Sequence, residues 1–221
     1  MLQTYRTGGD IHAATTSVIF RIPFKTAADK NEPHYKERRT IAKNCNFGVF
    51  YGLFPSGLQK TLKFKAGLDM TKEQCAGIID NLKNGYPRLT EWQDETAITL
   101  YAETWLGRRR YIVGILSPDW GKRSFAERCA MNTPIQGTAA DIIKLAMGRI
   151  VQGIKKRPWL KPFLQIHDEL VFEIPADKLD EAVCFVKACM EETPFTDFDV
   201  PIIAEAAYGT NFGDLVEMEG V

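Results

Sequence analysis

The chain has 221 residues, of which 45% are hydrophobic and 25% are charged, the proportions of a globular protein long enough to bury a core. Twenty-eight basic residues balance 28 acidic residues, which excludes a globally basic nucleic-acid-binding protein but allows a locally basic one. The sequence has no apolar run long enough for a membrane helix, and residues 1–10 lack the apolar core of a signal peptide.

The first half of the chain is predicted to be mainly helical, with loops where loop-forming residues gather. Residues 29–33 form a predicted loop because Pro, Asp and Asn gather there. A helix is predicted over 38–54, although Gly48 and Gly52 lower its propensity. Pro55 is predicted to stop this helix.

Two further helices are predicted before a second loop. The first covers 71–82, where Thr71 is the N-cap and Gln74 completes a capping box. The second covers 87–101 and carries Pro at its first turn. The loop follows at 117–121.

The second half of the chain mixes helices and strands. Residues 126–152 are predicted to be helical, with Pro134 marking a start or a kink. Residues 163–174 are rich in β-formers and predict a hairpin with carboxylates at its turn. A helix over 179–190 and a strand over 201–208 complete the set, with the hairpin and this strand expected in one antiparallel sheet. The partial segregation of helices and strands predicts an α+β fold.

The five cysteines predict reduced thiols. Their number is odd, no pair has CxxC spacing, and only three histidines are available to help them bind a metal. These features argue against a disulfide framework or a zinc site and favour a cytoplasmic protein. The cysteines are Cys45, Cys75, Cys129, Cys184 and Cys189.

The balanced net charge conceals a strong asymmetry along the chain. Residues 34–65 contain seven basic residues against one acid, and residues 107–128 contain six against two. Residues 168–221 contain fourteen acids against two lysines. This asymmetry fits either a polyanionic partner or oppositely charged faces that pair with each other.

One predicted helix has the side chains of a nucleotide site. Arg39, Lys43, Phe47 and Tyr51 recur every four residues, so each lies about 40° from the last on one helix face. Cations can hold a triphosphate and aromatics can pack against a base or sugar. The glycine after each aromatic would allow close approach. The alternative is an amphipathic surface helix with two core aromatics.

The same stretch resembles a known family. Residues 39–52 match the pattern R-x3-K-x3-F-G-x2-Y-G of the fingers helix of family A DNA polymerases, the DNA polymerase I family. Further segments resemble, in the family's order, the region after its first catalytic motif, an Arg-rich element, its palm helix and its last catalytic motif. These segments are residues 9–12, 107–111, 127–141 and 165–170.

The resemblance implies a magnesium-dependent nucleotidyl transfer. Two Mg²⁺ ions would neutralise the triphosphate and activate the primer 3′-hydroxyl. Asp168 would be a catalytic carboxylate and metal ligand, presented by the tight hairpin turn, and Glu169 a weaker candidate. Without the resemblance, His167, Asp168 and Glu169 would be interpreted as a polar turn.

The resemblance also implies roles for the helix side chains. Arg39, Lys43 and His12 would bind the incoming deoxynucleoside triphosphate, and Lys43 would be placed to protonate the leaving pyrophosphate. Phe47 would pack beside the sugar and base, and its missing hydroxyl implies discrimination against dideoxynucleotides. Tyr51 would stack near the template base.

A third group would contact primer–template DNA. Asn132, Gln136 and His167 resemble residues that touch the minor groove, where acceptors are shared by correct base pairs. Arg108 and Arg109 belong to a predicted phosphate-contact cluster. The alternative for this arginine cluster is a solvated loop.

The resemblance implies a domain layout that is incomplete. Residues 1–11 would be a palm edge, 12–118 the fingers subdomain and 119–221 the C-terminal part of the palm. The family's first catalytic Asp lies upstream of the matching segment, so the two Mg²⁺ ions would be only partly liganded here. We expect weak activity or none from this chain alone.

Three alternatives account for that expectation. A second polymerase chain could supply the first motif and the thumb, or the chain could be part of a longer enzyme. The third is a noncatalytic polymerase-like module that binds nucleotide or primer–template DNA.

Overall fold

The computed structural model describes residues 2–218 and divides into two compact units, Met1–Gly137 (unit 1) and Thr138–Val221 (unit 2). The boundary lies inside the longest helix, α8 (Trp120–Ile154). The subdomain limits predicted from the family, after residues 11 and 118, stay predictions. None of the described helices has the length and apolarity needed to cross a membrane.

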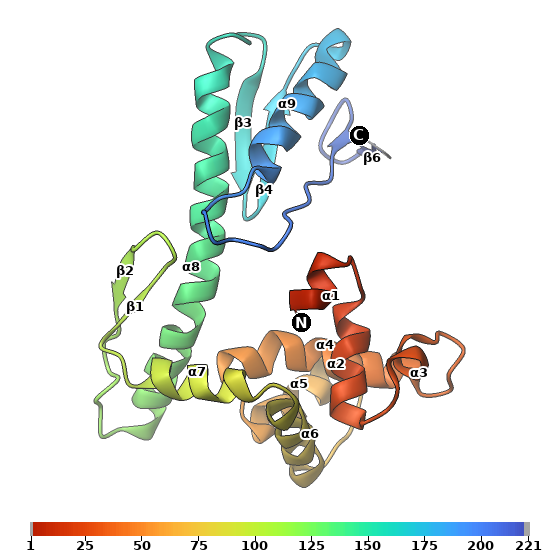
Figure 1. Cartoon of the computed structure of the whole chain (residues 1–221), viewed down its shortest axis with the longest axis vertical. Coiled ribbons are helices and arrows are strands. Elements are labelled where there is room, and N and C mark those ends of the chain that lie inside the picture. Colours follow the sequence, from red (N-terminus) through yellow and green to blue (C-terminus); the bar gives the residue numbers. More distant parts are fainter. Residues whose placement is uncertain (1, 219–221) are drawn as a thin grey trace. The chain divides into compact units, whose positions relative to one another are not determined.

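Unit 1 is mainly helical (Figure 1). Its elements before α8 are α1 (Leu2–Arg6), α2 (Ile11–Phe20), α3 (Phe24–Ala28), α4 (Tyr35–Gly48), the 3₁₀ turn η1 (Val49–Tyr51), α5 (Pro55–Ala66), α6 (Lys72–Gly85), α7 (Pro87–Ala97), β1 (Tyr101–Glu103) and β2 (Arg109–Tyr111).

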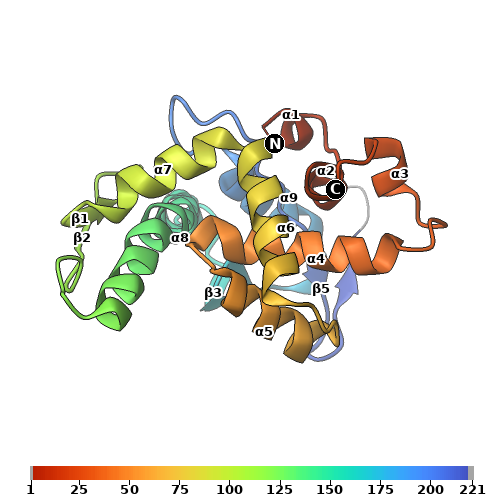
Figure 2. The same ribbon diagram turned by 90° about the horizontal axis from the view of Figure 1, so that it is seen from below.

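The main core of unit 1 joins four helices, α2, α4, α5 and α6, which are grouped together in Figure 2. Helices α4, α5 and α6 contribute apolar residues at helical spacing, the pattern that buries one face of a helix, and α2 contributes Ile19. Burial and the neighbouring Cys75 raise the pKa of Cys45 to about 12, so this thiol acts as a packing group. The largest fully buried members of this core are Ile19, Ile41, Leu58, Leu62 and Leu82.

A smaller core lies under the β1–β2 hairpin. Ala102 and Ile112 pack with Ala126 and Ala130 from the N-terminal part of α8. The two strands are antiparallel, with Ala102 opposite Arg110. This packing places the β1–β2 hairpin next to α8, with Arg108 in the connection and Arg109 and Arg110 in β2.

Unit 2 packs a hairpin and a helix against the C-terminal part of α8 (Figure 1). Strand β3 (Lys161–Ile166) pairs antiparallel with β4 (Glu169–Glu173). The turn η2 (Ala176–Lys178) leads into α9 (Leu179–Glu191), and the short strands β5 (Ala207–Tyr208) and β6 (Val216–Glu217) follow. The buried residues of this core are Ile150, Leu160, Ala182 and Cys189.

The structure confirms the α+β class and several predicted elements. The Thr71–Gln74 capping box is formed by both of its hydrogen bonds, at 3.2 and 2.8 Å. The loop at 29–33 and the hairpin with a polar turn are also as predicted. The five cysteines are free thiols, as expected.

Other predicted limits are wrong for physical reasons. Pro55 begins α5, since proline at the first helical position gives up an N–H that would be unpaired anyway. The helix predicted to run to 101 ends at Ala97, and Tyr101 opens β1. Helix α8 begins at Trp120, within the loop predicted at 117–121. Pro134 lies inside this helix and does not mark its start, and the kink predicted as the alternative stays a prediction.

The prediction of one antiparallel sheet is also wrong. The described strands form three separate two-stranded sheets. Within the strand predicted over 201–208, only Ala207 and Tyr208 form a β-strand. They pair with β6 and not with the β3–β4 hairpin. The sequence around β6 has no alternation strong enough to predict this pairing.

Candidate functional site

Helix α4 carries the cations predicted to hold a triphosphate. Its buried face consists of Ile41, Ala42 and Cys45, which turn the opposite face outward. Arg39 is half-buried and Lys43 is exposed on that outer face. No carboxylate of the described chain lies within ion-pair distance of Lys43, so its ammonium is available to an anionic ligand.

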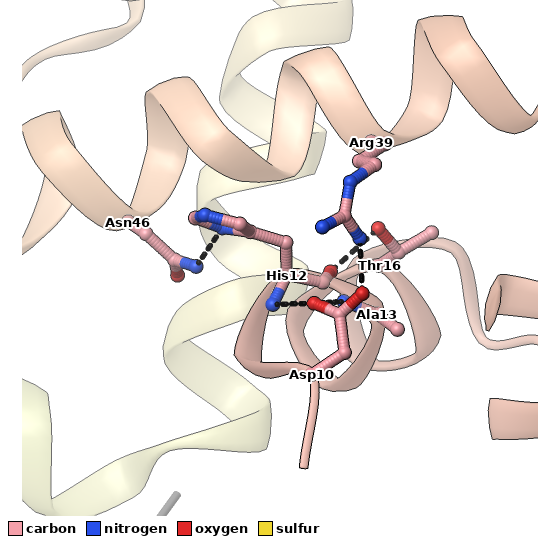
Figure 3. Close-up of polar contacts among 6 residues, drawn as sticks. All are labelled: Asp10, His12, Ala13, Thr16, Arg39 and Asn46. Atoms are coloured by element: carbon pink, nitrogen blue, oxygen red, sulfur yellow. Dashed lines mark hydrogen bonds and ion pairs between the residues drawn. The ribbon is translucent and has the colours of Figure 1, made fainter. Parts of the chain in front are cut away.

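Asp10 connects this face to the adjoining helix α2 (Figure 3). It is the N-cap of α2, where its Oδ1 accepts from the N–H groups of His12 at 2.9 Å and Ala13 at 3.1 Å. Its Oδ2 forms an ion pair with Arg39 at 2.5 Å. The Arg39 guanidinium also lies 5.8 Å from the centre of the Tyr35 ring. Arg39 is therefore held in one orientation.

The charge of Arg39 changes the acidity of Asp10. Partial burial acts to raise the pKa of Asp10, but the hydrogen bond and charge of Arg39 oppose it, together with the N–H groups of Ala13 and His12. The net result is a pKa below the ordinary value of 3.8. Asp10 is therefore ionised at neutral pH and neutralises part of the cationic charge.

His12 lies between the two helices, beside an exposed aromatic ring. Its ring centre is 6.4 Å from that of Phe47, with 47° between the ring planes. The side chain of Phe47 is free to meet a ligand, since the residue is 64% exposed. We refer to Asp10, His12, Arg39, Lys43 and Phe47 as the α2–α4 cluster.

Three polar side chains behind this cluster extend from Tyr86 to His12. Asn46 Nδ2 lies 3.1 Å from His12 Nδ1, and Thr15 Oγ1 donates to Asn46 Oδ1 at 2.9 Å. The Tyr86 side chain is hydrogen-bonded to Thr15. Burial acts first to lower the pKa of His12, and the cations Arg39 and Lys43 lower it further, while Asp10 opposes them. His12 is therefore neutral at pH 7.

Tyr51 lies just beyond the regular helix. It ends the 3₁₀ turn η1, so the four-residue spacing that places Arg39, Lys43 and Phe47 on one face does not extend to it. The buried Gln93 holds this turn, because its Nε2 donates to the carbonyls of Val49 at 2.6 Å and Phe50 at 3.2 Å.

The glycines flanking this turn serve the fold. A Cβ on Gly48 would lie 2.5 Å from Leu53 Cδ2. Gly52 has φ 78°, the left-handed conformation that favours glycine at a helix end. The close approach that was predicted for a base is taken at Gly48 by the Leu53 side chain.

The predicted DNA-contacting residues of unit 1 lie on the β1–β2 hairpin and on α8. Arg108 donates to the Gly137 carbonyl at 2.9 Å. Arg109 is ion-paired with Glu103 at 2.5 Å and lies 4.7 Å from the Tyr101 ring centre. On α8, Gln136 is exposed and Asn132 is half-buried. Asn132 Oδ1 is among the buried oxygen atoms of the described chain that lack a hydrogen-bond partner.

The acidic turn of unit 2, His167, Asp168 and Glu169, is exposed at the end of the β3–β4 hairpin. Ile166 pairs with Glu169, so His167 and Asp168 form a two-residue connection. His167 has φ 52°, a left-handed conformation that is unfavourable for a residue with a Cβ. Gln165 Nε2 donates to the His167 carbonyl at 2.6 Å and braces the turn.

The donors at the acidic turn fit part of a magnesium site. Carboxylate oxygens are the ligands that Mg²⁺ prefers, and Asp168 and Glu169 supply two of them. Within residues 2–218, no group of three or more His, Cys, Asp or Glu side chains is arranged to hold a metal. The turn alone is therefore short of a complete site.

Sequence reasoning missed Asp10, Asn46, Thr15 and Gln93 as contributors. Asp10 had a readable signal, because an Asp just before an apolar helical segment is a typical N-cap. Its contact with Arg39 joins residues that are 29 positions apart, and no local pattern predicts it. The same holds for Gln93, whose partners are 43 and 44 positions away.

Comparison with known proteins gives concordant matches. The family model described as DNA polymerase family A matches residues 1–214. The thermostable DNA polymerase I of Thermus filiformis is 35% identical over 219 residues, which cover 95% of this chain and 24% of that protein. DNA polymerase I of Geobacillus stearothermophilus is 34% identical, over 97% of this chain and 23% of that protein. The chain thus spans about a quarter of the length of these curated relatives.

A solved structure is similar in fold. It is described as the POL domain of Pol1 from M. smegmatis in complex with DNA primer-template and dNTP. Its TM-score is 0.76 at 31% sequence identity, and the match covers 90% of this chain and 34% of that chain.

Proposed function

The chain belongs to DNA polymerase family A, and on this premise we propose that it forms the nucleotide-binding part of a DNA-directed DNA polymerase. The proposed reaction adds deoxynucleotides to a primer 3′ end on a DNA template. The observation that carries this proposal is the α2–α4 cluster, which brings two cations, a neutral histidine and an exposed phenylalanine to adjoining helices.

In this proposal Arg39 and Lys43 bind the triphosphate of the incoming nucleotide, and His12 donates a hydrogen bond to it. Charge-assisted hydrogen bonds to phosphate oxygens are stronger than neutral ones, which suits this use of the cations. Lys43 is exposed and supplies a proton to the leaving pyrophosphate. Phe47 packs beside the sugar and base, and Tyr51 stacks near the template base.

Asp168, with Glu169 as a weaker candidate, would hold Mg²⁺ at the acidic turn. The ions, when bound, would stabilise the triphosphate charge and activate the primer hydroxyl. Because the described residues supply only part of such a site, we propose that further ligands come from another polymerase segment, in the same polypeptide or in a second chain.

The proposed partners are primer–template DNA and deoxynucleoside triphosphates. The ligands named for the M. smegmatis domain support them. Asn132, Gln136 and His167 are the proposed minor-groove contacts, and Arg108 and Arg109 the proposed phosphate contacts. The five free thiols support a cytoplasmic setting.

A reconstituted primer-extension assay tests the proposal. The 221-residue chain is mixed with a polypeptide carrying the remaining segments of a family A polymerase, with Mg²⁺, labelled primer–template and all four dNTPs. We expect extension only when both polypeptides are present. Primer–template or nucleotide binding without extension in any such mixture would instead support the noncatalytic module.

A further inference from the structure

We propose that Asn46 is a positioning residue that fixes the His12 imidazole in one tautomer, with its proton on Nε2 directed to the nucleotide. This inference rests on the proposed function for its purpose, because the Nε2–H group is the donor assigned to the triphosphate. The tautomer itself follows from hydrogen bonds in the nucleotide-free chain.

The Asn46 amide directs its Oδ1 to Thr15. Thr15 is fully buried, and its hydroxyl lies 2.9 Å from Asn46 Oδ1, which can only accept. The single proton of Thr15 is therefore given to Asn46.

With Oδ1 directed to Thr15, the amide group Nδ2 faces His12. It lies 3.1 Å from His12 Nδ1 (Figure 3). An amide NH₂ only donates, so Nδ1 must accept and carries no proton. The proton of the neutral ring is then on Nε2, which has no hydrogen-bond partner in the described part of the chain.

The charges around His12 favour the same state. Asp10 faces it from its own helix, and Arg39 and Lys43 face it from α4. A protonated ring would place a third cation beside Arg39 and Lys43 and would direct Nδ1–H against the Asn46 N–H. A neutral ring with a fixed Nε2–H avoids both costs and still offers the triphosphate a donor whose orientation is already set.

Nitrogen NMR of histidine gives a direct test, since the two tautomers have different ¹⁵N shifts. The chain contains three histidines, and a His12→Gln variant identifies the signals of His12. In the wild-type chain without nucleotide, we expect the Nδ1 shift of an unprotonated nitrogen and the Nε2 shift of a protonated one. The reverse pattern would overturn the inference.

Asn46→Asp is the informative variant and Asn44→Asp is its matched control. Both add one negative charge to α4, but Asn44 Nδ2 donates to the Thr40 carbonyl of its own helix. An aspartate at position 46 accepts from Nδ1–H, so we expect His12 to gain a proton on Nδ1. In Asn44→Asp the tautomer should not change. Identical His12 spectra in both variants would contradict the inference.

Thr15→Val provides a second test that does not change the charge. It removes the hydroxyl that orients Asn46, so the amide can rotate and we expect both tautomers of His12. Unchanged helical circular dichroism would show that the variants fold. A single Nε2–H tautomer in a folded Thr15→Val chain would argue against the relay from Thr15.

Measurements of nucleotide binding distinguish a failure of this inference from a failure of the proposed function. For dATP binding at pH 7, we expect Asn46→Asp to be about two- to tenfold weaker than Asn44→Asp, the range for loss of one hydrogen bond. Equal affinities would overturn the positioning role. A wild-type chain with the expected tautomer that binds no dATP would instead overturn the proposed function and leave the tautomer assignment intact.

Discussion

The α2–α4 cluster and the acidic turn carry opposite charges and are held in place by different means. In the cluster, side chains restrain one another: Asp10 binds Arg39, and Asn46 binds His12. In the acidic turn, the backbone restrains the residues, through strand pairing and the left-handed conformation of His167.

The difference follows from side-chain length. An Arg or Lys side chain loses up to about 2 kcal/mol of conformational entropy when it is ordered, so a partner that orders it in advance lowers the cost of binding. A short Asp on a two-residue turn has few torsions to lose. Variants of the two regions should therefore lose different properties.

The largest effect is expected at the acidic turn. Asp168→Asn in the reconstituted primer-extension assay should lower the rate by about a hundredfold or more, because a metal supplies several kcal/mol of charge stabilisation. Asp177→Asn, at an exposed position in η2, is the matched control. Equal rates for the two variants would show that Asp168 is not a metal ligand.

The next effect is expected at Lys43. Lys43→Ala should weaken dATP binding by about 10- to 100-fold, the range for one charge-assisted hydrogen bond. Lys60→Ala removes a charge from another exposed lysine, on α5, and should bind as the wild type does. Isothermal titration calorimetry of the three proteins gives the comparison. A similar loss in both variants would indicate general electrostatics rather than a site.

Two variants of Asp10 distinguish its role as the N-cap of α2 from its ion pair with Arg39. Asp10→Asn keeps a good N-cap and loses the Arg39 ion pair, so local stability of α2 should fall by a few tenths to about 1 kcal/mol. Asp10→Ala also loses the cap and should cost about 1 kcal/mol more. Hydrogen exchange of the α2 amides measures both changes, and equal exchange in the two variants would contradict this division.

The contribution of Asp10 should depend on pH in a defined direction. Because the pKa of Asp10 is lower in the folded chain than its ordinary value of 3.8, its ionisation stabilises the fold above that value. The advantage of wild type over Asp10→Asn should disappear as the pH falls through the lowered pKa. An advantage that grew in acid would exclude the ion pair as its cause.

An effect of similar size is expected at His167. At φ 52° a glycine is more favourable than an alanine by about 1 kcal/mol. His167→Gly should therefore slow hydrogen exchange in the hairpin relative to His167→Ala. Both variants should weaken primer–template binding, because both lose the side chain. A hairpin that is equally stable in the two variants would show that the backbone at His167 carries no strain.

The sequence predicts what local patterns encode. The four-residue spacing placed Arg39, Lys43 and Phe47 on one face, and β-formers around a polar trio predicted the hairpin with its carboxylates. The capping box at Thr71 was readable for the same reason. These features depend on residues within one turn or one hairpin.

Features that depend on distant residues were not predictable. The Asp10–Arg39 ion pair, the link from Thr15 to Asn46 and the buried Gln93 join elements far apart in the chain. Pro134 lies inside α8, so a local helix breaker did not by itself predict a helix limit. The pairing of β5 with β6, and not with the β3–β4 hairpin, is likewise a contact that β-propensity does not predict.

The central claim is that the α2–α4 cluster binds the triphosphate. Titration of dATP into the ¹⁵N-histidine-labelled chain tests it, because His12 lies in the cluster and His34 lies just before α4. We predict that the His12 signals shift to saturation while those of His34 stay unchanged, and that Lys43→Ala weakens this response. His12 signals that do not move at high dATP, or that move equally in Lys43→Ala, would contradict the claim.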